Sequence, residues 1–126
     1  MVLAVPKESW PGERRVAATP ETVTRLVGMG FDVRVEADAG LKAAFADEDY
    51  AKAGATVTAD VAAVWSEADV LLKVQPPSGD EVDRLKAGAV LISFLFPAKN
   101  DALIARLAAR KATAIAMDQV PRITRA

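Results

Sequence analysis

The sequence predicts one α/β domain with a doubly wound, flavodoxin-like, mostly parallel sheet that carries helices on both faces. Six short apolar runs alternate along the chain with segments of helical periodicity. Runs such as Val70-Leu71-Leu72 are continuously apolar, which is typical of strands that are buried on both sides. The length of 126 residues is that of one compact domain. The expected strands are Val2–Val5, Phe31–Glu36, Ala55–Val57, Asp69–Val74, Ala89–Phe94 and Thr113–Met117.

The helices expected between these strands are indicated by caps and by apolar stripes. Thr19 can cap the first helix, since Pro20 follows it at the first helical position. Ser78 and Glu81 have the spacing of a capping box. The other expected caps are Asp47 and Asn100, and the expected inward faces are Val61, Val64, Trp65 and Ala68 in the third helix and Leu103, Ile104, Leu107 and Ala108 in the fifth.

The composition argues against several classes of chemistry. The chain has no cysteine and no histidine, so it offers no disulfide and no thiolate nucleophile, and it lacks the commonest general base. Without these residues we expect no zinc or copper site. The net charge of -1 provides no bulk attraction to nucleic acid. The longest apolar-rich run, residues 87–98, is too short to cross a bilayer, and no signal peptide is visible, so we expect a cytoplasmic protein.

Three cations lie after expected strands or, for Lys73, inside one near its carboxyl end, at the edge of the sheet where ligands of open α/β folds bind. Arg15 could hold a carboxylate or phosphate through two hydrogen bonds, or it could belong to a solvated charged loop. Lys73 could point into the crevice, or it could pack its stem on the sheet and extend its ammonium group to water. Arg122, with Arg125, could meet a dinucleotide or a partner domain, or form an ordinary basic turn.

The common nucleotide-binding and catalytic motifs are missing. No G-x-G-x-x-G follows a strand, because Gly28 and Gly30 lie between a helix and a strand. There is also no P-loop lysine, nucleophile elbow or metal-ligand cluster, so the sequence assigns no catalytic residue. We expect Trp10 to be a partly exposed loop residue, and Phe94 and Phe96 to pack at the end of the fifth strand.

Several segments together carry a family resemblance. They are Pro6-Lys7-Glu8, Gly12-Glu13-Arg14-Arg15-Val16-Ala17, Pro20, Gly30-Phe31-Asp32-Val33-Arg34-Val35-Glu36, Ala53-Gly54-Ala55, Ala68-Asp69-Val70-Leu71-Leu72-Lys73-Val74 and Thr113-Ala114-Ile115-Ala116-Met117. Over essentially the whole chain, the sequence resembles the alanine dehydrogenase and transhydrogenase alpha-subunit superfamily. Two further segments are similar to the transhydrogenase branch, namely Lys73-Val74-Gln75-Pro76-Pro77 and Pro121-Arg122-Ile123-Thr124-Arg125-Ala126.

The resemblance implies a two-domain NAD(H)-binding subunit, in which this chain is the first domain and a Rossmann domain is the second. It implies a homodimer that exchanges hydride with the NADP(H)-binding domain of a membrane-embedded beta subunit. Proton translocation is coupled to that exchange, and the subunit lies in the cytoplasm at the inner membrane. Because the Rossmann domain is missing, we expect residues 1–126 to be a fragment that binds NAD weakly or not at all.

The resemblance also assigns roles to single residues. In the dehydrogenase branch, the residues at the positions of Arg15 and Lys73 hold the keto-acid substrate. In the transhydrogenase branch, the arginine matching Arg122 lies near the nicotinamide and helps to hold it. The glutamine expected directly after Ala126 is not in the chain. Alanine dehydrogenases carry a catalytic histidine in the region of Phe96, and a phenyl ring transfers no proton. Alanine dehydrogenase activity is therefore disfavoured. An amino-acid dehydrogenase and a standalone, non-catalytic interaction domain remain as alternatives.

Overall fold

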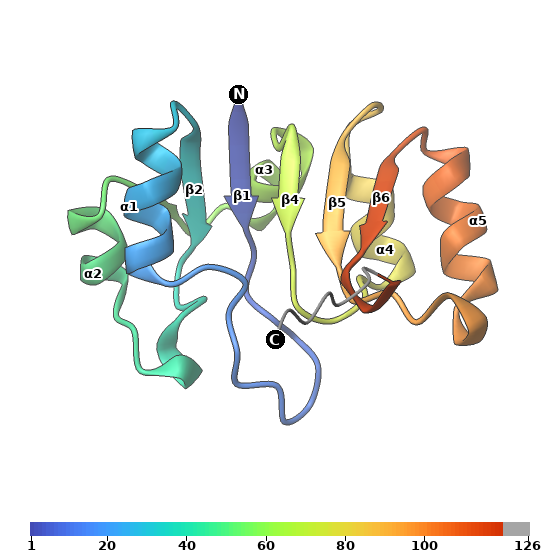
Figure 1. Cartoon of the computed structure of the whole chain (residues 1–126), viewed down its shortest axis with the longest axis horizontal. Coiled ribbons are helices and arrows are strands. Elements are labelled where there is room, and N and C mark those ends of the chain that lie inside the picture. The colour runs from blue at the N-terminus through green and yellow to red at the C-terminus, as the bar shows by residue number, and fades with distance from the viewer. Residues whose placement is uncertain (120–126) are drawn as a thin grey trace, which may run out of the picture.

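A sheet of six parallel strands forms the centre of the computed structural model, which describes residues 1–119 (Figure 1). Its spatial order is β3-β2-β1-β4-β5-β6. The strands are β1 (Val2–Val5), β2 (Asp32–Glu36), β3 (Thr56–Thr58), β4 (Val70–Leu72), β5 (Val90–Ser93) and β6 (Thr113–Ala116). The helices are α1 (Pro20–Gly28), α2 (Asp47–Lys52), α3 (Val61–Ser66), α4 (Gly79–Arg84) and α5 (Asp101–Ala109), with short 3-10 helices η1 (Leu41–Ala43), η2 (Pro97–Lys99) and η3 (Met117–Gln119).

The helices lie on both faces of this sheet. Alternate residues of β1 belong to different cores: Leu3 and Val5 lie in the core with α1 and α2, whereas Ala4 lies in the core with α3, α4 and α5. The chain first winds outward from β1 to β3, returns through α3 to the other side of β1, and then winds outward in the opposite direction. Because parallel crossovers are right-handed, this reversal moves the later helices to the other face.

The structure confirms the predicted fold class, an α/β doubly wound sheet with helices on both faces. All neighbouring strands in the described part of the chain pair in parallel. The strand order differs from the flavodoxin-like order, in which the third strand lies next to the first. Here β3 lies outside β2, and β4 occupies the place next to β1. The 3-2-1-4-5-6 order is that of dinucleotide-binding Rossmann sheets. Apolar strands alone do not specify which neighbour they pair with.

Two buried cores hold the helices on the sheet. On the side of α3, α4 and α5, Trp65 packs with Leu71 of β4 and Leu91 of β5, as expected for a core tryptophan. On the side of α1 and α2, the buried Tyr50 donates a hydrogen bond from its hydroxyl to the Ala18 carbonyl oxygen at 2.8 Å. This bond satisfies the polar end of a buried ring and fastens the segment before α1 to α2.

Two of the expected caps are confirmed. The Thr22 N–H donates to Thr19 Oγ1 at 3.2 Å at the start of α1. At the start of α4, Ser78 and Glu81 form the predicted capping box. Both caps satisfy backbone N–H groups that have no partner within the helix.

The other two expected caps differ in the structure. Asp47 is the first residue of α2, and its carboxylate accepts the Asp38 N–H instead of capping the helix. Asn100 holds the cap position of α5, but its side chain makes no capping bond and donates to carbonyl oxygens of the preceding turn. Ala108, expected to face inward, is exposed, whereas Leu107 is buried.

Strand ends set the position of the candidate residues. β4 ends at Leu72, so Lys73 directly follows the strand rather than lying within it. β5 ends at Ser93, which places Phe94 and Phe96 in the turn beyond it. Among residues 1–119, no helix has the length and apolar character needed to span a bilayer.

Candidate functional site

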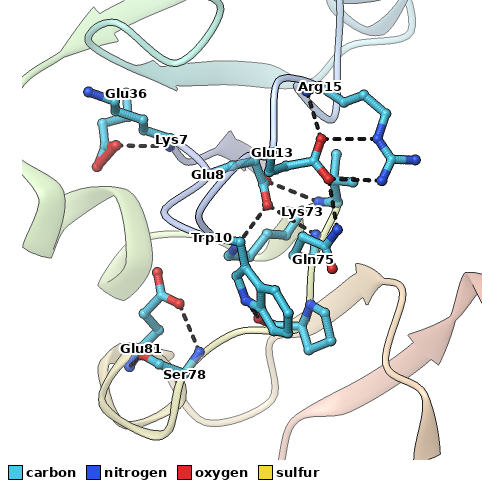
Figure 2. A network of polar contacts seen from close by, with 12 residues as sticks. Lys7, Glu8, Trp10, Glu13, Arg15, Glu36, Lys73, Gln75, Ser78 and Glu81 are labelled. Atoms are coloured by element: carbon cyan, nitrogen blue, oxygen red, sulfur yellow. Dashed lines mark hydrogen bonds and ion pairs between the residues drawn. The ribbon is translucent and has the colours of Figure 1, made fainter. Parts of the chain in front are cut away.

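The candidate site lies where β1 and β4 end side by side at the centre of the sheet. The chain reverses its winding direction between these two strands, and such switch points are the usual ligand positions of open α/β sheets. Residues 6–19 form the long connection after β1, and residues 73–78 form the shorter one after β4. These two segments carry the polar network drawn in Figure 2.

The centre of the network is a buried ion pair between the two segments. Lys73 Nζ donates to Glu8 Oε1 at 2.8 Å, and the two side chains are 0% and 3% exposed. The Glu8 carboxylate also accepts the backbone N–H groups of Val74 and Gln75, each at 3.0 Å. Glu8 is therefore held by three donors, all from the segment that follows β4, and it compensates the buried ammonium group.

A second glutamate binds the arginine predicted as a ligand-holding residue. Glu13 accepts the Arg15 backbone N–H at 2.8 Å, Nε at 3.0 Å and Nη2 at 2.8 Å. Gln75 Nε2 donates to the same carboxylate at 2.7 Å, which joins this pair to the segment after β4. The hydrogen bond from the Arg15 side chain is the main reason that the pKa of Glu13 falls to about 2. Glu13 is thus an ionised acceptor at neutral pH within this network.

Further contacts fasten the segment after β1 to its surroundings. Trp10 Nε1 donates to the Pro76 carbonyl oxygen at 3.1 Å, and the residue is 47% exposed, as expected. The Lys7 N–H donates to Glu36 Oε2 at 2.8 Å at the end of β2 (Figure 2). Burial raises the pKa of Glu36 above its ordinary value. The segment after β1 therefore contacts both neighbouring strand ends and closes over the central strands.

The structure brings Arg15 and Lys73 to one cavity of about 320 Å³. Its other walls are mainly apolar, with Leu72, Ile92 and Phe94 among them. The Lys73 ammonium group reaches neither water nor a free face of the crevice, because Glu8 binds it in the interior. The Arg15 side chain is 61% exposed and lies with its Cζ atom 5.8 Å from the centroid of the Phe94 ring. Of the two cations, only Arg15 is accessible to a ligand in this conformation.

A tight turn follows β5 and contains Phe94, one of the residues that line the cavity. Asp118 accepts the N–H groups of Leu95 and Phe96 at 2.9 and 3.1 Å. The bond from Leu95 is the main reason that the pKa of Asp118 lies below its ordinary value. Asn100 Nδ2 donates to the carbonyl oxygens of Leu95 and Phe96 at 2.7 and 3.3 Å. Phe96, expected to pack, is 42% exposed, and its ring stacks beside that of Phe94.

Several residues of the site could not be assigned from sequence. Glu8, Glu13 and Gln75 lie in the segments quoted for the family resemblance, but each reads by itself as an ordinary polar loop residue. The available signal was Lys73, because an apolar neighbourhood requires a compensating carboxylate for a buried ammonium group. No pattern in the sequence indicated that Asp118 would bind the turn after β5.

Two predicted features are not tested by the described residues. Arg122 lies outside residues 1–119, so its position relative to the cavity is not described. Residues 1–119 contain no group of three or more histidine, cysteine, aspartate or glutamate side chains that could hold a metal ion.

Comparison with known proteins finds relatives with two kinds of name. The chain is 44% identical over 126 residues to the NAD(P) transhydrogenase subunit alpha of Haemophilus influenzae. The aligned segment covers 100% of this chain and 24% of that protein. It is 45% identical over 120 residues to the alanine dehydrogenase of Halomonas elongata. This alignment covers 95% of this chain and 32% of that protein. The chain thus spans about a quarter to a third of the length of these relatives.

A solved structure agrees with these relatives. The crystal structure of transhydrogenase from Sinorhizobium meliloti superposes with a TM-score of 0.93 at 44% identity, over 98% of this chain and 37% of that one. The two kinds of relative have nearly equal identity to this chain, so percentage identity does not choose between them. The model of the family described as "Alanine dehydrogenase/PNT, N-terminal domain" matches residues 4–126. The chain belongs to this family of alanine dehydrogenase and transhydrogenase N-terminal domains.

Proposed function

We propose that the chain is part of the NAD(H)-binding subunit of a proton-translocating NAD(P) transhydrogenase. In this function, hydride passes between NADH and NADP+, and a membrane-embedded beta subunit with its own NADP-binding domain couples the exchange to proton movement. The observation that carries the proposal is the chemistry of the crevice. It offers no histidine, its buried cation is neutralised by Glu8, and its outer turn presents a phenyl ring.

Hydride exchange between two nicotinamide rings makes different demands from those of keto-acid reduction. Reduction of a carbonyl needs a proton donor beside the oxygen and cations for the substrate carboxylate. Exchange between nicotinamides needs neither, and it asks the protein to position two rings and to exclude water. An apolar crevice with Phe94 and Ile92 in its wall suits this second task.

NAD is the cofactor that this function requires, and its redox chemistry is supplied by the nicotinamide ring. The cavity beside Arg15 has the apolar walls that a planar ring needs. No pyrophosphate-binding loop is present among the described residues, because Gly28 and Gly30 lie between α1 and β2 rather than after a strand. We therefore infer that a separate Rossmann domain holds the pyrophosphate, and that residues 1–126 form one wall of the nucleotide cleft.

The wider setting follows from the same proposal. The subunit forms a homodimer on the cytoplasmic side of the inner membrane, attached there through its beta-subunit partner. Arg122 contacts the nicotinamide of the bound nucleotide. In this setting Lys73 keeps its structural role in the ion pair with Glu8, and Arg15 remains the accessible cation at the cavity.

The experiment that tests this function is an exchange assay on the subunit, with its nucleotide-binding domain and its membrane partner present. NADH and an NADP analogue of distinct absorbance are the substrates. Arg122→Ala should lower the rate about 10- to 100-fold, because a hydrogen bond to a charged group contributes about 1.5–3 kcal/mol. Arg25→Ala is the matched control, since Arg25 forms an exposed pair with Glu21 on α1 far from the site. An unchanged rate in Arg122→Ala would remove the proposed nicotinamide contact, and no exchange by the unmodified complex would remove the function.

One specific observation favours a second candidate, an NAD-dependent amino-acid dehydrogenase. Arg15 and Lys73 both line the same cavity, as a keto-acid site of the dehydrogenase branch would require. A ligand carboxylate would have to displace Glu8 before it could reach the Lys73 ammonium group. Oxidation of NADH that depends on pyruvate and ammonia, by the same subunit, would support this candidate.

A further inference from the structure

The turn after β5 contains an aromatic residue in a backbone conformation that is unfavourable for it. Phe96 has φ 46° and ψ 62°, in the left-handed region. Four non-glycine residues of the described chain have positive φ, and Phe96 is the aromatic one among them. A bulky side chain in this region costs free energy, and glycine would adopt the same backbone with less strain. A strained residue that keeps a large side chain is a reason to look for a function of that side chain.

The strained turn is held from both sides by side chains of other elements. Asp118 binds the N–H groups of Leu95 and Phe96, and Asn100 binds their carbonyl oxygens. All four backbone polar groups of the two residues therefore have side-chain partners. The Asn100 amide serves this turn instead of capping α5, and the Asp118 carboxylate reaches back from η3. The arrangement fixes the direction in which the Phe96 ring leaves the backbone.

The Phe96 ring stacks beside the ring of Phe94, which lines the candidate cavity. The rings of Phe94 and Phe96 lie with their centroids 6.1 Å apart and their planes 16° apart. Phe94 lines the cavity beside Arg15, and the outer neighbour Phe96 is 42% exposed. Met117, which also lines the cavity, is exposed as well. Phe96 therefore offers a partly exposed apolar ring directly beside Phe94, a residue of the cavity wall.

We propose that Phe96 is a further ligand-contacting residue, whose ring packs against the nicotinamide ring of the bound dinucleotide, and that Asp118 and Asn100 are its positioning residues. This inference rests on the proposed function and names a contact within it. A phenyl face suits the nicotinamide because the flat face of the ring, in either redox state, can bury apolar surface against it, and the oxidised ring, which is cationic, gains a further attraction. It offers nothing to the adenosine diphosphate part of the nucleotide. Phe96 therefore distinguishes ligands with the nicotinamide from ligands without it.

The test measures binding of two ligands to the subunit that carries its nucleotide-binding domain. NADH contains the nicotinamide ring, and ADP-ribose is the same molecule without it. Phe96→Gly should raise the dissociation constant of NADH about 3- to 10-fold, the effect of one aromatic contact, and leave that of ADP-ribose unchanged. Phe96→Trp should bind NADH like the unmodified subunit. The thermal midpoint of Phe96→Gly should not fall, because the released backbone strain offsets the lost ring contact.

Two further variants separate a ligand contact from a structural role. Lys111→Gly removes the same kind of strain at φ 60°, at the opposite end of β6, and should leave both dissociation constants unchanged. Asp118→Asn loosens the turn and should weaken NADH binding, though less than Phe96→Gly, again without effect on ADP-ribose.

The outcomes separate this inference from the function on which it rests. If the unmodified subunit does not bind NADH, both are overturned. If it binds NADH, but Phe96→Gly leaves NADH binding unchanged or weakens NADH and ADP-ribose equally, the contact alone is overturned. If Asp118→Asn leaves NADH binding unchanged, the positioning role of Asp118 is overturned.

Discussion

The buried pair of Glu8 and Lys73 gives the sharpest stability prediction. Both side chains are almost completely removed from solvent, and Glu8 also accepts two backbone N–H groups. Glu8→Gln removes the negative charge and places an amide NH₂ group among three donors. Lys73→Met removes the ammonium group but leaves the Glu8 carboxylate with its two backbone donors. The two substitutions should therefore lower the free energy of unfolding by different amounts, and Glu8→Gln should lower it more than Lys73→Met.

The expected magnitudes follow from what each substitution leaves unpaired. Glu8→Gln leaves a buried ammonium group without compensation, which costs about 3–5 kcal/mol of unfolding free energy. Lys73→Met loses one hydrogen bond to a charged group, about 1.5–3 kcal/mol. The double variant leaves no buried charge, so its cost should be smaller than the sum of the single costs by about 2 kcal/mol or more. A domain of this size has about 5–15 kcal/mol in total, so each effect is measurable.

Urea unfolding followed by circular dichroism at neutral pH measures the unmodified chain, the two single variants and the double variant. Glu21→Gln is the control, because Glu21 pairs with Arg25 on the surface of α1, and its loss should cost about 0.5 kcal/mol or less. If the single variants cost no more than the control and their effects add, Glu8 and Lys73 are not a buried pair. The account of a neutralised cation in the crevice would then be wrong.

Three smaller predictions concern the surroundings of the site. Gly40→Ala should destabilise the fold by about 1–3 kcal/mol in thermal unfolding, since the added Cβ would lie 2.6 Å from Tyr50 Cε2. Tyr50→Phe should cost about 1–2 kcal/mol in the same assay, because it leaves the Ala18 carbonyl oxygen without its donor. Arg15 lowers the pKa of Glu13 from 4.5 to about 2, so the ionised Glu13 carboxylate stabilises the folded chain. This contribution to the free energy of unfolding is complete above pH 4.5 and is lost as the pH falls towards 2. Thermal midpoints between pH 7 and 2.5 should therefore fall less steeply in Glu13→Gln than in the unmodified chain, and equal slopes would contradict the role of this carboxylate.

The fold class could be predicted because apolar periodicity and caps are local signals. Continuous apolar runs at 70–72 and 90–92 identified buried strands, and the signals at Thr19 and Ser78 located helix starts correctly. The place of β3 outside β2 could not be predicted, since it depends on the direction of each crossover and not on the composition of the strands. Asn100 was wrong as a cap because a competing pair of carbonyl oxygens lies within its reach in the folded chain.

Sequence signals pointed to two cations of the candidate site and not to the carboxylates that bind them. Strand ends and charge singled out Arg15 and Lys73, and both line one cavity in the structure, whereas Arg122 lies outside the described residues. The partners Glu8 and Glu13 come from a different segment, and loop carboxylates are too common for sequence alone to pair them with a given cation. The exposed ring of Phe96 was also missed, because its orientation depends on the carboxylate of Asp118, 22 residues away.

One measurement tests the central claim most directly, that this crevice serves hydride exchange between nicotinamides and not reduction of a keto acid. The complete subunit and its membrane partner are given NADH deuterated at the transferred hydride position, together with NADP+, pyruvate and ammonia. Mass spectrometry then identifies the product that carries the deuterium. We expect the label in NADPH and none in alanine, and deuterated alanine as the main product would contradict the claim.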